Sequence, residues 1–248
     1  MRTAKLVMAV LAAAAGVALA ADKVKVTILS ESMCPDCKNF LRDEVKPAFL
    51  VDGIWDIVDF EYLPWGNSFI ESPACPADGK YSATSRRCWY SLCSAASAPA
   101  EYCTNVTNTV CQHGANECLG DRYESCAINT SPTERAWYNF VLCFGLDHAG
   151  KINYARQCAL ASGYNVTELD MCVAAGNPVA DKYQLHDIQE TFANGPHNGV
   201  PWVRVDGELI ESGLLDAICK AYKGTKPAGC ANAKPANYIA AERCTNRN

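Results

Sequence analysis

The sequence predicts an α/β fold in which a small mixed sheet is interrupted by a long insertion that is helical and rich in disulfides. Three observations predict it. A strand, a helix and a second strand follow one another before position 64, and two strands and a helix follow after position 201. The segment between them, about 66–195, holds ten of the fifteen cysteines. With 49% hydrophobic and 20% charged residues, the chain can form a core of its own.

The N-terminal elements are predicted from residue type and spacing. Residues 24–29, Val-Lys-Val-Thr-Ile-Leu, are β-prone, and residues 57–63 form a second such run. A helix is expected from Cys34 or Pro35 to about Pro47, because proline is well tolerated in a first helical turn. A strand, a helix and a strand this close together predict parallel strands with a right-handed crossover.

The insertion begins where this pattern ends, after the run Pro64 to Asn67. Its first part, residues 68–130, contains seven cysteines, many small polar residues and little periodicity, so we expect loops held by disulfides. From Thr133 the apolar spacing is helical. Further helices are expected over 152–162, 168–175 and 180–192.

The C-terminal part returns to β character at 202–206. The Asp-Gly pair at 206–207 is a typical hairpin turn, so residues 208–210 are expected to form the returning strand. A last helix is predicted over about 214–222, ending near a glycine.

The order β-α-β, insertion, β-β-α is typical of the thioredoxin fold, and a Cys-x-x-Cys between the first strand and first helix is a further signature of it. We therefore predict a thioredoxin-like domain over 21–224, with residues 225–248 as a tail.

Residues 1–20 are predicted to be a secretory signal. Arg2 and Lys5 precede an apolar run at 6–19, and Ala-Leu-Ala at 18–20 fits a cleavage site. Fourteen apolar residues are too few to cross a bilayer, so no membrane span is expected. The net charge of −5, without a basic stripe, argues against a nucleic-acid partner.

Fifteen cysteines in an exported chain predict a disulfide framework, because the secretory pathway is oxidising. Sequons at Asn105, Asn129 and Asn165 fit the same compartment and are candidate glycosylation sites. Cys219 and Cys230 flank the end of the last predicted helix, and we expect them to pair.

The odd number of cysteines leaves one without a partner in the chain, once Cys34 and Cys37 are set aside. Cys244, in a polar C-terminal segment, is the favoured candidate, and we expect that it can link two precursor chains. The alternative is that an insertion cysteine such as Cys75 or Cys103 is unpaired.

A metal site is a less favoured use of the cysteines. Cys34 and Cys37 have zinc-ligand spacing, and Cys111, His113 and Cys118 could complete such a site. Zinc knuckles normally repeat the close pair, and the sequence has no second Cys-x-x-Cys, so no metal is expected.

Cys34 and Cys37 are the candidate catalytic residues. Disulfide exchange needs a thiolate that attacks and a second thiol that resolves the mixed disulfide. A helix N-terminus lowers the pKa of Cys34, whereas Asp36 would oppose this, and Cys37 lies one turn further on. The alternative is that the two cysteines form an inert bridge.

Val200 and Pro201 are the candidate substrate-binding residues, because Pro201 directly precedes a predicted strand. Thioredoxin-fold proteins carry a cis-proline there, facing the active cysteines. The backbone of Val200 would then pair with an extended substrate segment. A trans proline that starts a strand is the alternative.

A family signature lies in the insertion. The block resembles the Cys-Gln-His-Gly-x-x-Glu-Cys motif, with its later cysteine, of the gamma-interferon-inducible lysosomal thiol reductases (GILT). Its members are Cys111, Gln112, His113, Gly114, Glu117, Cys118 and Cys126. Asp121 stands where that family usually has Asn. His113 is expected to be a loop histidine bonded to backbone; the alternative is that it lies near the dithiol and tunes it. His186 and His197 are expected to lie at the surface.

The resemblance implies a soluble, lysosomal, endosomal or secreted thiol reductase that acts on protein disulfides at acidic pH. It implies Cys34 and Cys37 as the active pair, no cofactor, a small thiol as a possible reductant, and trimming of the C-terminal tail. Two alternatives stay open. One is an oxidase or isomerase of the same fold, and the other is a non-catalytic, cysteine-rich secreted binding protein.

Overall fold

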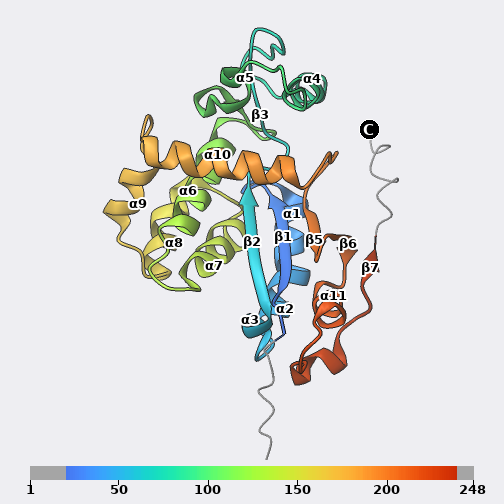
Figure 1. Cartoon of the computed structure of the whole chain (residues 1–248). Coiled ribbons are helices and arrows are strands. Elements are labelled where there is room, and N and C mark those ends of the chain that lie inside the picture. The colour runs from blue at the N-terminus through green and yellow to red at the C-terminus, as the bar shows by residue number, and fades with distance from the viewer. Residues whose placement is uncertain (1–20, 239–248) are drawn as a thin grey trace, which may run out of the picture.

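A computed structural model describes residues 21–238 of the chain (Figure 1). The predicted signal over 1–20 and the tail cysteine Cys244 lie outside the described residues, so both stay predictions. Within 21–238, no helix combines the length and apolar character that crossing a membrane requires.

The centre of the molecule is a mixed five-stranded sheet with the order β2-β1-β5-β6-β7. β1 (Val24–Ser30) pairs in parallel with β2 (Val58–Pro64) and antiparallel with β5 (Trp202–Val205). β6 (Glu208–Ser212) and β7 (Asn237–Tyr238) continue the sheet in antiparallel pairing. The predicted α/β class and the thioredoxin-like order of its elements are confirmed.

The helices that follow β1 and β6 share one core with the sheet. They are α1 (Pro35–Phe40), the π-helical segment η1 (Leu41–Val45), α2 (Lys46–Phe49), α3 (Ile54–Ile57) and α11 (Leu214–Ala221). Their buried side chains, among them Phe49 and Ile218, belong to the same core cluster as Ile28 of β1. This packing fixes the start of α1 at the end of β1.

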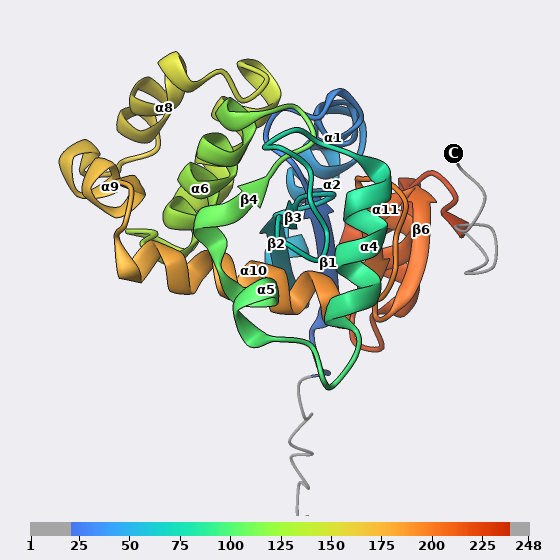
Figure 2. The same ribbon diagram turned by 90° about the horizontal axis from the view of Figure 1, so that it is seen from above.

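The insertion forms a helical layer beside β2. It contains α6 (Ala115–Asn129), α7 (Ala136–Val141), α8 (Ala155–Ala161), α9 (Val166–Val173) and α10 (Pro178–Ala193). Both α6 and α10 contact β2, and α6 to α9 surround a second core around Phe140 and Phe144. Figure 2 shows α6, α8 and α9 to one side of the sheet, while α10 runs from them across to β2 and β1.

The first part of the insertion is more regular than expected. Residues 68–130 contain α4 (Ala83–Cys93), α5 (Ala100–Thr104) and most of α6, with β3 (Phe69–Ile70) paired to β4 (Thr109–Val110). The expectation of loops was wrong for α6 because its inward face carries Glu117, Asp121 and Glu124, which remove the apolar periodicity of a buried helix.

The stretch after residue 224, expected to be a tail, packs on the domain as far as residue 238. A 3-10 turn, η5 (Ala228–Asn232), follows α11, and β7 then forms an edge of the sheet. Gly213 has φ +76°, and a Cβ there would lie 2.5 Å from Ala236 Cα, so this close approach needs glycine.

Six disulfides hold the described part of the chain together. They are Cys75–Cys88, Cys93–Cys103, Cys111–Cys118, Cys126–Cys172, Cys143–Cys158 and Cys219–Cys230. Within 21–238 only Cys34 and Cys37 are free thiols. The alternative of an unpaired Cys75 or Cys103 is therefore wrong, and Cys111 and Cys118 cannot serve as zinc ligands while they are bonded to each other.

Candidate functional site

The two free thiols lie at the start of α1. Cys34 is the N-cap residue, Pro35 opens the helix, and Cys34 Sγ accepts a hydrogen bond from the backbone N–H of Cys37 at 3.3 Å. Both residues are buried, with exposed fractions of 7% for Cys34 and 2% for Cys37. The helix start thus places one sulfur at the surface of the site and the other behind it.

The two thiols differ in acidity. The hydrogen bond from the Cys37 thiol lowers the pKa of Cys34 to about 7, with help from backbone N–H groups and against burial and the charge of Asp36. Burial raises the pKa of Cys37, and its hydrogen bond to Cys34 raises it further. This arrangement gives one thiol that ionises readily and one that holds its proton.

Val200 lies against the thiols in the segment directly before β5, and Pro201 follows it. The Val200–Pro201 peptide bond is cis, and the Cys34 thiol donates to the Val200 carbonyl at 3.8 Å. Val200 and Trp202 form an apolar cluster with Leu29 and both cysteines. An extended segment bound here would meet the Cys34 sulfur and the Val200 backbone together.

The signature block is held by two disulfides and by a hydrogen bond to the segment that follows β2. Cys111–Cys118 ties the turn before α6 to its first turn, and Cys126–Cys172 ties α6 to α9. Gly114, at the N-cap of α6, has φ +90°, a conformation that favours glycine. The Gln112 side chain accepts a hydrogen bond from Asn67 Nδ2 at 2.7 Å, which links the block to the segment after β2.

His113 binds carboxylates rather than the backbone, so the expectation for its ring was wrong. Its Nδ1 lies 2.5 Å from Glu117 Oε2 and 3.6 Å from Glu31 Oε2. Burial raises the pKa of Glu31, the charges of Glu117 and Cys34 add to this, and a hydrogen bond from Asn67 N–H opposes it. Glu31 is not among the residues predicted from the sequence, although an acidic residue three positions before Cys34 is a visible signal.

Asp121 fixes the loop that precedes α1. Its Oδ1 accepts the backbone N–H of Ser32 at 2.8 Å, and Ser32 Oγ donates to the Glu117 carbonyl at 3.3 Å. A Cβ on Gly120 would lie 2.4 Å from Ser32 Oγ, so the close approach of α6 to this loop needs a glycine there. The side-chain oxygen of an Asn at position 121 could accept the same hydrogen bond.

His197 is buried, not at the surface as expected. Its Nε2 lies 2.9 Å from Arg86 Nη2 and 3.0 Å from the Gly66 carbonyl, and Arg86 also donates to the His197 carbonyl. Burial lowers the pKa of His197 to about 4, and Arg86 contributes. His186 is exposed on α10.

The three sequon asparagines are exposed, at the end of α5, the end of α6 and the start of α9. Asn105 follows α5, Asn129 Nδ2 donates to the Ser125 carbonyl at 2.9 Å, and Asn165 Oδ1 caps α9. Their glycosylation stays a prediction.

Two groups of described side chains have the proximity of metal ligands. In the first, Cys143 and Cys158 are bonded to each other, which leaves His148 without thiolate partners. In the second, Glu31, His113 and Glu117 bring their ligand atoms within 4.8 Å of one another. There the histidine nitrogen is already engaged by Glu117.

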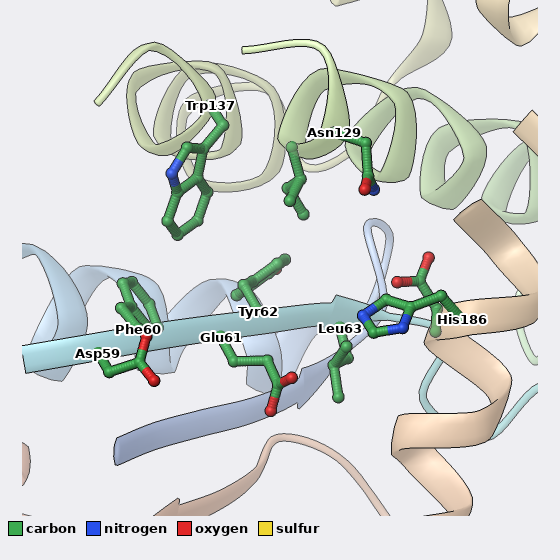
Figure 3. A pocket seen from close by; sticks show the side chains of 10 residues that line it. Asp59, Phe60, Glu61, Tyr62, Leu63, Asn129, Trp137 and His186 are labelled. Atoms are coloured by element: carbon green, nitrogen blue, oxygen red, sulfur yellow. The ribbon is translucent and has the colours of Figure 1, made fainter. Parts of the chain in front are cut away.

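A pocket of about 260 Å³ lies along β2 (Figure 3). Phe60 and Tyr62 of β2 line it with Trp137 of α7, Asn129 of α6 and His186 of α10. It contains neither free cysteine.

Comparison with known proteins identifies the family of this chain. The model of the gamma interferon inducible lysosomal thiol reductase (GILT) family matches residues 25–79 and 90–162, more than half of the chain. This chain belongs to the GILT family. A GILT-family chain with this fold is a thiol reductase, that is, a disulfide oxidoreductase.

Curated GILT relatives match most of the chain. The gamma-interferon-responsive lysosomal thiol protein of Arabidopsis thaliana is 29% identical over 84% of this chain and 76% of its own. The gamma-interferon-inducible lysosomal thiol reductase of Carassius auratus is 25% identical over 85% and 73%. A solved thioredoxin-like oxidoreductase from Silicibacter pomeroyi DSS-3 aligns at 16% identity over 81% and 87%, with a TM-score of 0.47.

Proposed function

We propose that this GILT-family chain reduces disulfide bonds of protein substrates through Cys34 and Cys37, at acidic pH in endosomes or lysosomes. The observation that carries the proposal is the contrast between the thiols: Cys34 at the helix start has a pKa lowered to about 7, while burial raises that of Cys37. A small thiol would regenerate the reduced pair.

The reaction follows from this contrast. The Cys34 thiolate attacks one sulfur of the substrate disulfide, forming a mixed disulfide and releasing the other substrate sulfur as a thiolate. Cys37 then loses its proton and attacks Cys34 Sγ. The second substrate thiolate leaves, and two electrons have moved from the cysteine pair to the substrate.

Acidic activity is compatible with these acidities. Lowering the pKa of Cys34 from 9.0 to about 7 gives roughly a hundredfold more thiolate at acidic pH than an ordinary cysteine has. Burial raises the pKa of the nearby Glu31 carboxyl, and the charge of Cys34 raises it further. Its protonation in acid removes negative charge that would oppose the thiolate.

Substrate binding is proposed at the Val200 backbone beside the cis-proline. A segment in extended conformation would pair there by β-augmentation, while its cystine reaches Cys34. The predicted signal, the exposed sequons and the disulfide framework support passage through the secretory pathway, and relatives named lysosomal support the acidic destination.

Insulin reduction as a function of pH tests the proposal. The wild-type chain should reduce insulin at acidic pH, Cys34→Ser should abolish turnover, and Cys37→Ser should accumulate a mixed disulfide visible on non-reducing gels. Cys244→Ser, which leaves both thiols in place, is the matched control and should retain activity.

Three results would contradict the proposal. Absence of turnover at every pH would favour the non-catalytic binding protein. Turnover by Cys37→Ser at the wild-type rate would show that the assigned roles are wrong. Faster oxidation of reduced substrates than reduction of insulin would favour the oxidase or isomerase.

A further inference from the structure

Two buried glutamates and one half-exposed histidine bring side-chain atoms together beside the turn that precedes α1. Glu31, His113 and Glu117 each place one potential metal-ligand atom within 4.8 Å of the other two. His113 Nδ1 lies 2.5 Å from Glu117 Oε2 and 3.6 Å from Glu31 Oε2. Both carboxyl side chains are 0% exposed, whereas that of His113 is 32% exposed. The three groups therefore meet at one point, with the histidine on the solvent side.

Each glutamate has one oxygen held by the backbone and one oxygen directed at this point. Glu31 Oε1 accepts the Asn67 N–H at 2.6 Å, and Glu117 Oε1 accepts the His113 N–H at 2.8 Å. The two Oε2 atoms are the ones that face His113 Nδ1. Carboxylates that bind metals are typically oriented by such second hydrogen bonds.

The Oε2 atom of Glu31 is the clearest sign that a ligand belongs here. It is buried and has no hydrogen-bond partner among the described residues. A buried carboxyl oxygen without a hydrogen bond is costly. The neighbouring backbone makes room for this side chain: Gly66 has φ +54°, and a Cβ there would overlap with Glu31 Cγ. The fold thus keeps an unpartnered oxygen against a histidine nitrogen instead of turning it to solvent.

Little positive charge pairs with these two carboxylates. Buried Arg86 directs its two terminal nitrogens at the carbonyl and the ring of His197. Among the described residues, His113 is the one basic group that forms an ion pair with Glu31 or Glu117. One imidazole carries at most a single positive charge, whereas the two carboxylates together carry two negative charges. A divalent cation between them would complete the balance, because buried charges are normally paired or bound to metals.

We propose that Glu31, His113 and Glu117 bind a divalent transition-metal ion, preferably Zn²⁺, through the two Oε2 atoms and Nδ1. One imidazole with two carboxylates is a donor set that Zn²⁺ accepts, and three protein ligands leave a fourth position for water. The cysteine spacing predicts no metal, but this site uses no sulfur. The inference does not depend on the proposed reductase function, and it gives the histidine and glutamate of the family signature a role.

The distances are close to those that zinc requires. Zn²⁺ binds nitrogen and oxygen at about 2.0–2.2 Å in a tetrahedral arrangement, so its ligand atoms lie roughly 3.3 Å apart. The separation of Glu31 Oε2 and His113 Nδ1, 3.6 Å, is already suitable. Glu117 Oε2 would move away from Nδ1 by about 0.8 Å as the ion replaces the hydrogen between them. The exposed His113 ring gives the ion a path from solvent.

The ion would link parts of the chain that are far apart in the sequence. Glu31 lies in the turn after β1, and its carbonyl accepts the backbone N–H of Cys34 at 3.3 Å. His113 precedes α6, and Glu117 lies in the first turn of that helix. A ligand that binds the folded chain and not the unfolded chain stabilises the fold. Zinc should therefore raise the melting temperature and hold the turn before Cys34 against α6.

Calorimetric titration of the full-length chain with Zn²⁺ at neutral pH tests the site. The chain is kept oxidised, so that Cys34 and Cys37 are bonded to each other, and any remaining thiol is alkylated. It should bind one Zn²⁺ per chain. Glu31→Gln, Glu117→Gln and His113→Ala should each weaken binding by at least about a hundredfold, because even the residues behind metal ligands contribute about ten- to a hundredfold.

Two variants serve as matched controls and should bind Zn²⁺ like the wild type. His186→Ala removes an exposed histidine of α10, and Glu124→Gln removes a buried carboxyl of α6 that lies outside the group. Because Glu31→Gln changes a buried residue, the decisive variant is His113→Ala, whose half-exposed side chain can be truncated without a cavity in the core. Zn²⁺ should raise the melting temperature of the wild type and of both controls, but not that of His113→Ala.

The metal site is overturned if the oxidised wild-type chain shows no saturable binding of Zn²⁺, or if His113→Ala and Glu117→Gln bind the ion as tightly as the wild type. Failure of the proposed function looks different. A chain that binds Zn²⁺ as expected but reduces no insulin rejects the reductase function alone, and a chain that reduces insulin without binding Zn²⁺ rejects the metal site alone.

Discussion

Asp121 is a carboxyl group buried where a neutral side chain would serve the same hydrogen bond. It is 2% exposed, and its Oδ1 accepts the Ser32 N–H while Oδ2 has no hydrogen-bond partner among the described residues. Burial raises its pKa, and the charges of Glu117 and Glu124 raise it further. The folded state therefore binds its proton more tightly than the unfolded chain does.

Asp121→Asn should stabilise the protein at neutral pH, by about 1–3 kcal/mol. The sign follows from the raised pKa. Between the unfolded value near 4 and the folded value, ionisation opposes folding, and Asn removes that opposition; in acid the carboxyl is protonated and the gain disappears. Urea unfolding at acidic and neutral pH measures both effects.

Asp56→Asn, at an exposed position before β2, is the control and should change little. Equal stability of Asp121→Asn and wild type at neutral pH would show that the buried carboxyl does not oppose folding.

At the level of elements, the sequence predicts those whose pattern is local. β1, β2 and α11 appear at the expected positions because β-branched runs and helical apolar spacing mark them. α6 was missed because the acidic residues on its buried face hide its periodicity. Within the site, Cys34 and Cys37 could be predicted from the sequence, because a local motif marks them.

The other residues of the site come together only when the chain is folded. Glu31, Arg86 and His197 come from a turn, a helix and a loop that are far apart in the chain. No local pattern indicates that such residues will be buried together, so His197 was expected at the surface. Their roles follow only from the packing of the insertion on the sheet.

The disulfide Cys219–Cys230 gives a test at the same scale. It closes a short loop between α11 and η5, with a sequence separation of 11. Replacing both cysteines by alanine should lower the free energy of unfolding by about 2–4 kcal/mol and leave insulin reduction intact, because the pair lies outside the dithiol site. A urea midpoint equal to that of wild type would show that this link adds no stability.

At the level of the whole molecule, several buried carboxyl groups have raised pKa values, whereas one buried histidine, His197, has a lowered pKa. Burial raises the pKa of Glu31, Asp121 and Glu124, and that of Asp187 to about 8, whereas it lowers the pKa of His197 to about 4. Each of these carboxyl groups lowers the free energy of unfolding as the pH rises from its pKa in the unfolded chain to its pKa in the folded protein. His197 has the opposite effect: it lowers the free energy of unfolding as the pH falls below its unfolded pKa near 6.5.

We therefore expect stability to increase as the pH falls from about 7 to about 6, with a slope near 1.4 kcal/mol per pH unit from Asp187. Above pH 7 the lowered pKa of Cys34 acts in the opposite sense, because ionisation of its thiol favours the folded state. The melting temperature should rise by about 3 °C between pH 7 and pH 6. Asp187→Asn should flatten the dependence, and a melting temperature that increases with pH would contradict the account.

The Cys219–Cys230 bond also limits how the C-terminus can be shortened. A protease that cuts between these two residues would not release the downstream peptide, which would stay attached through sulfur. Only a cut beyond Cys230 frees a fragment. A cut before Asn237 would also take β7 away and leave the backbone groups of β6 without their neighbour, an open edge to which another extended chain can add.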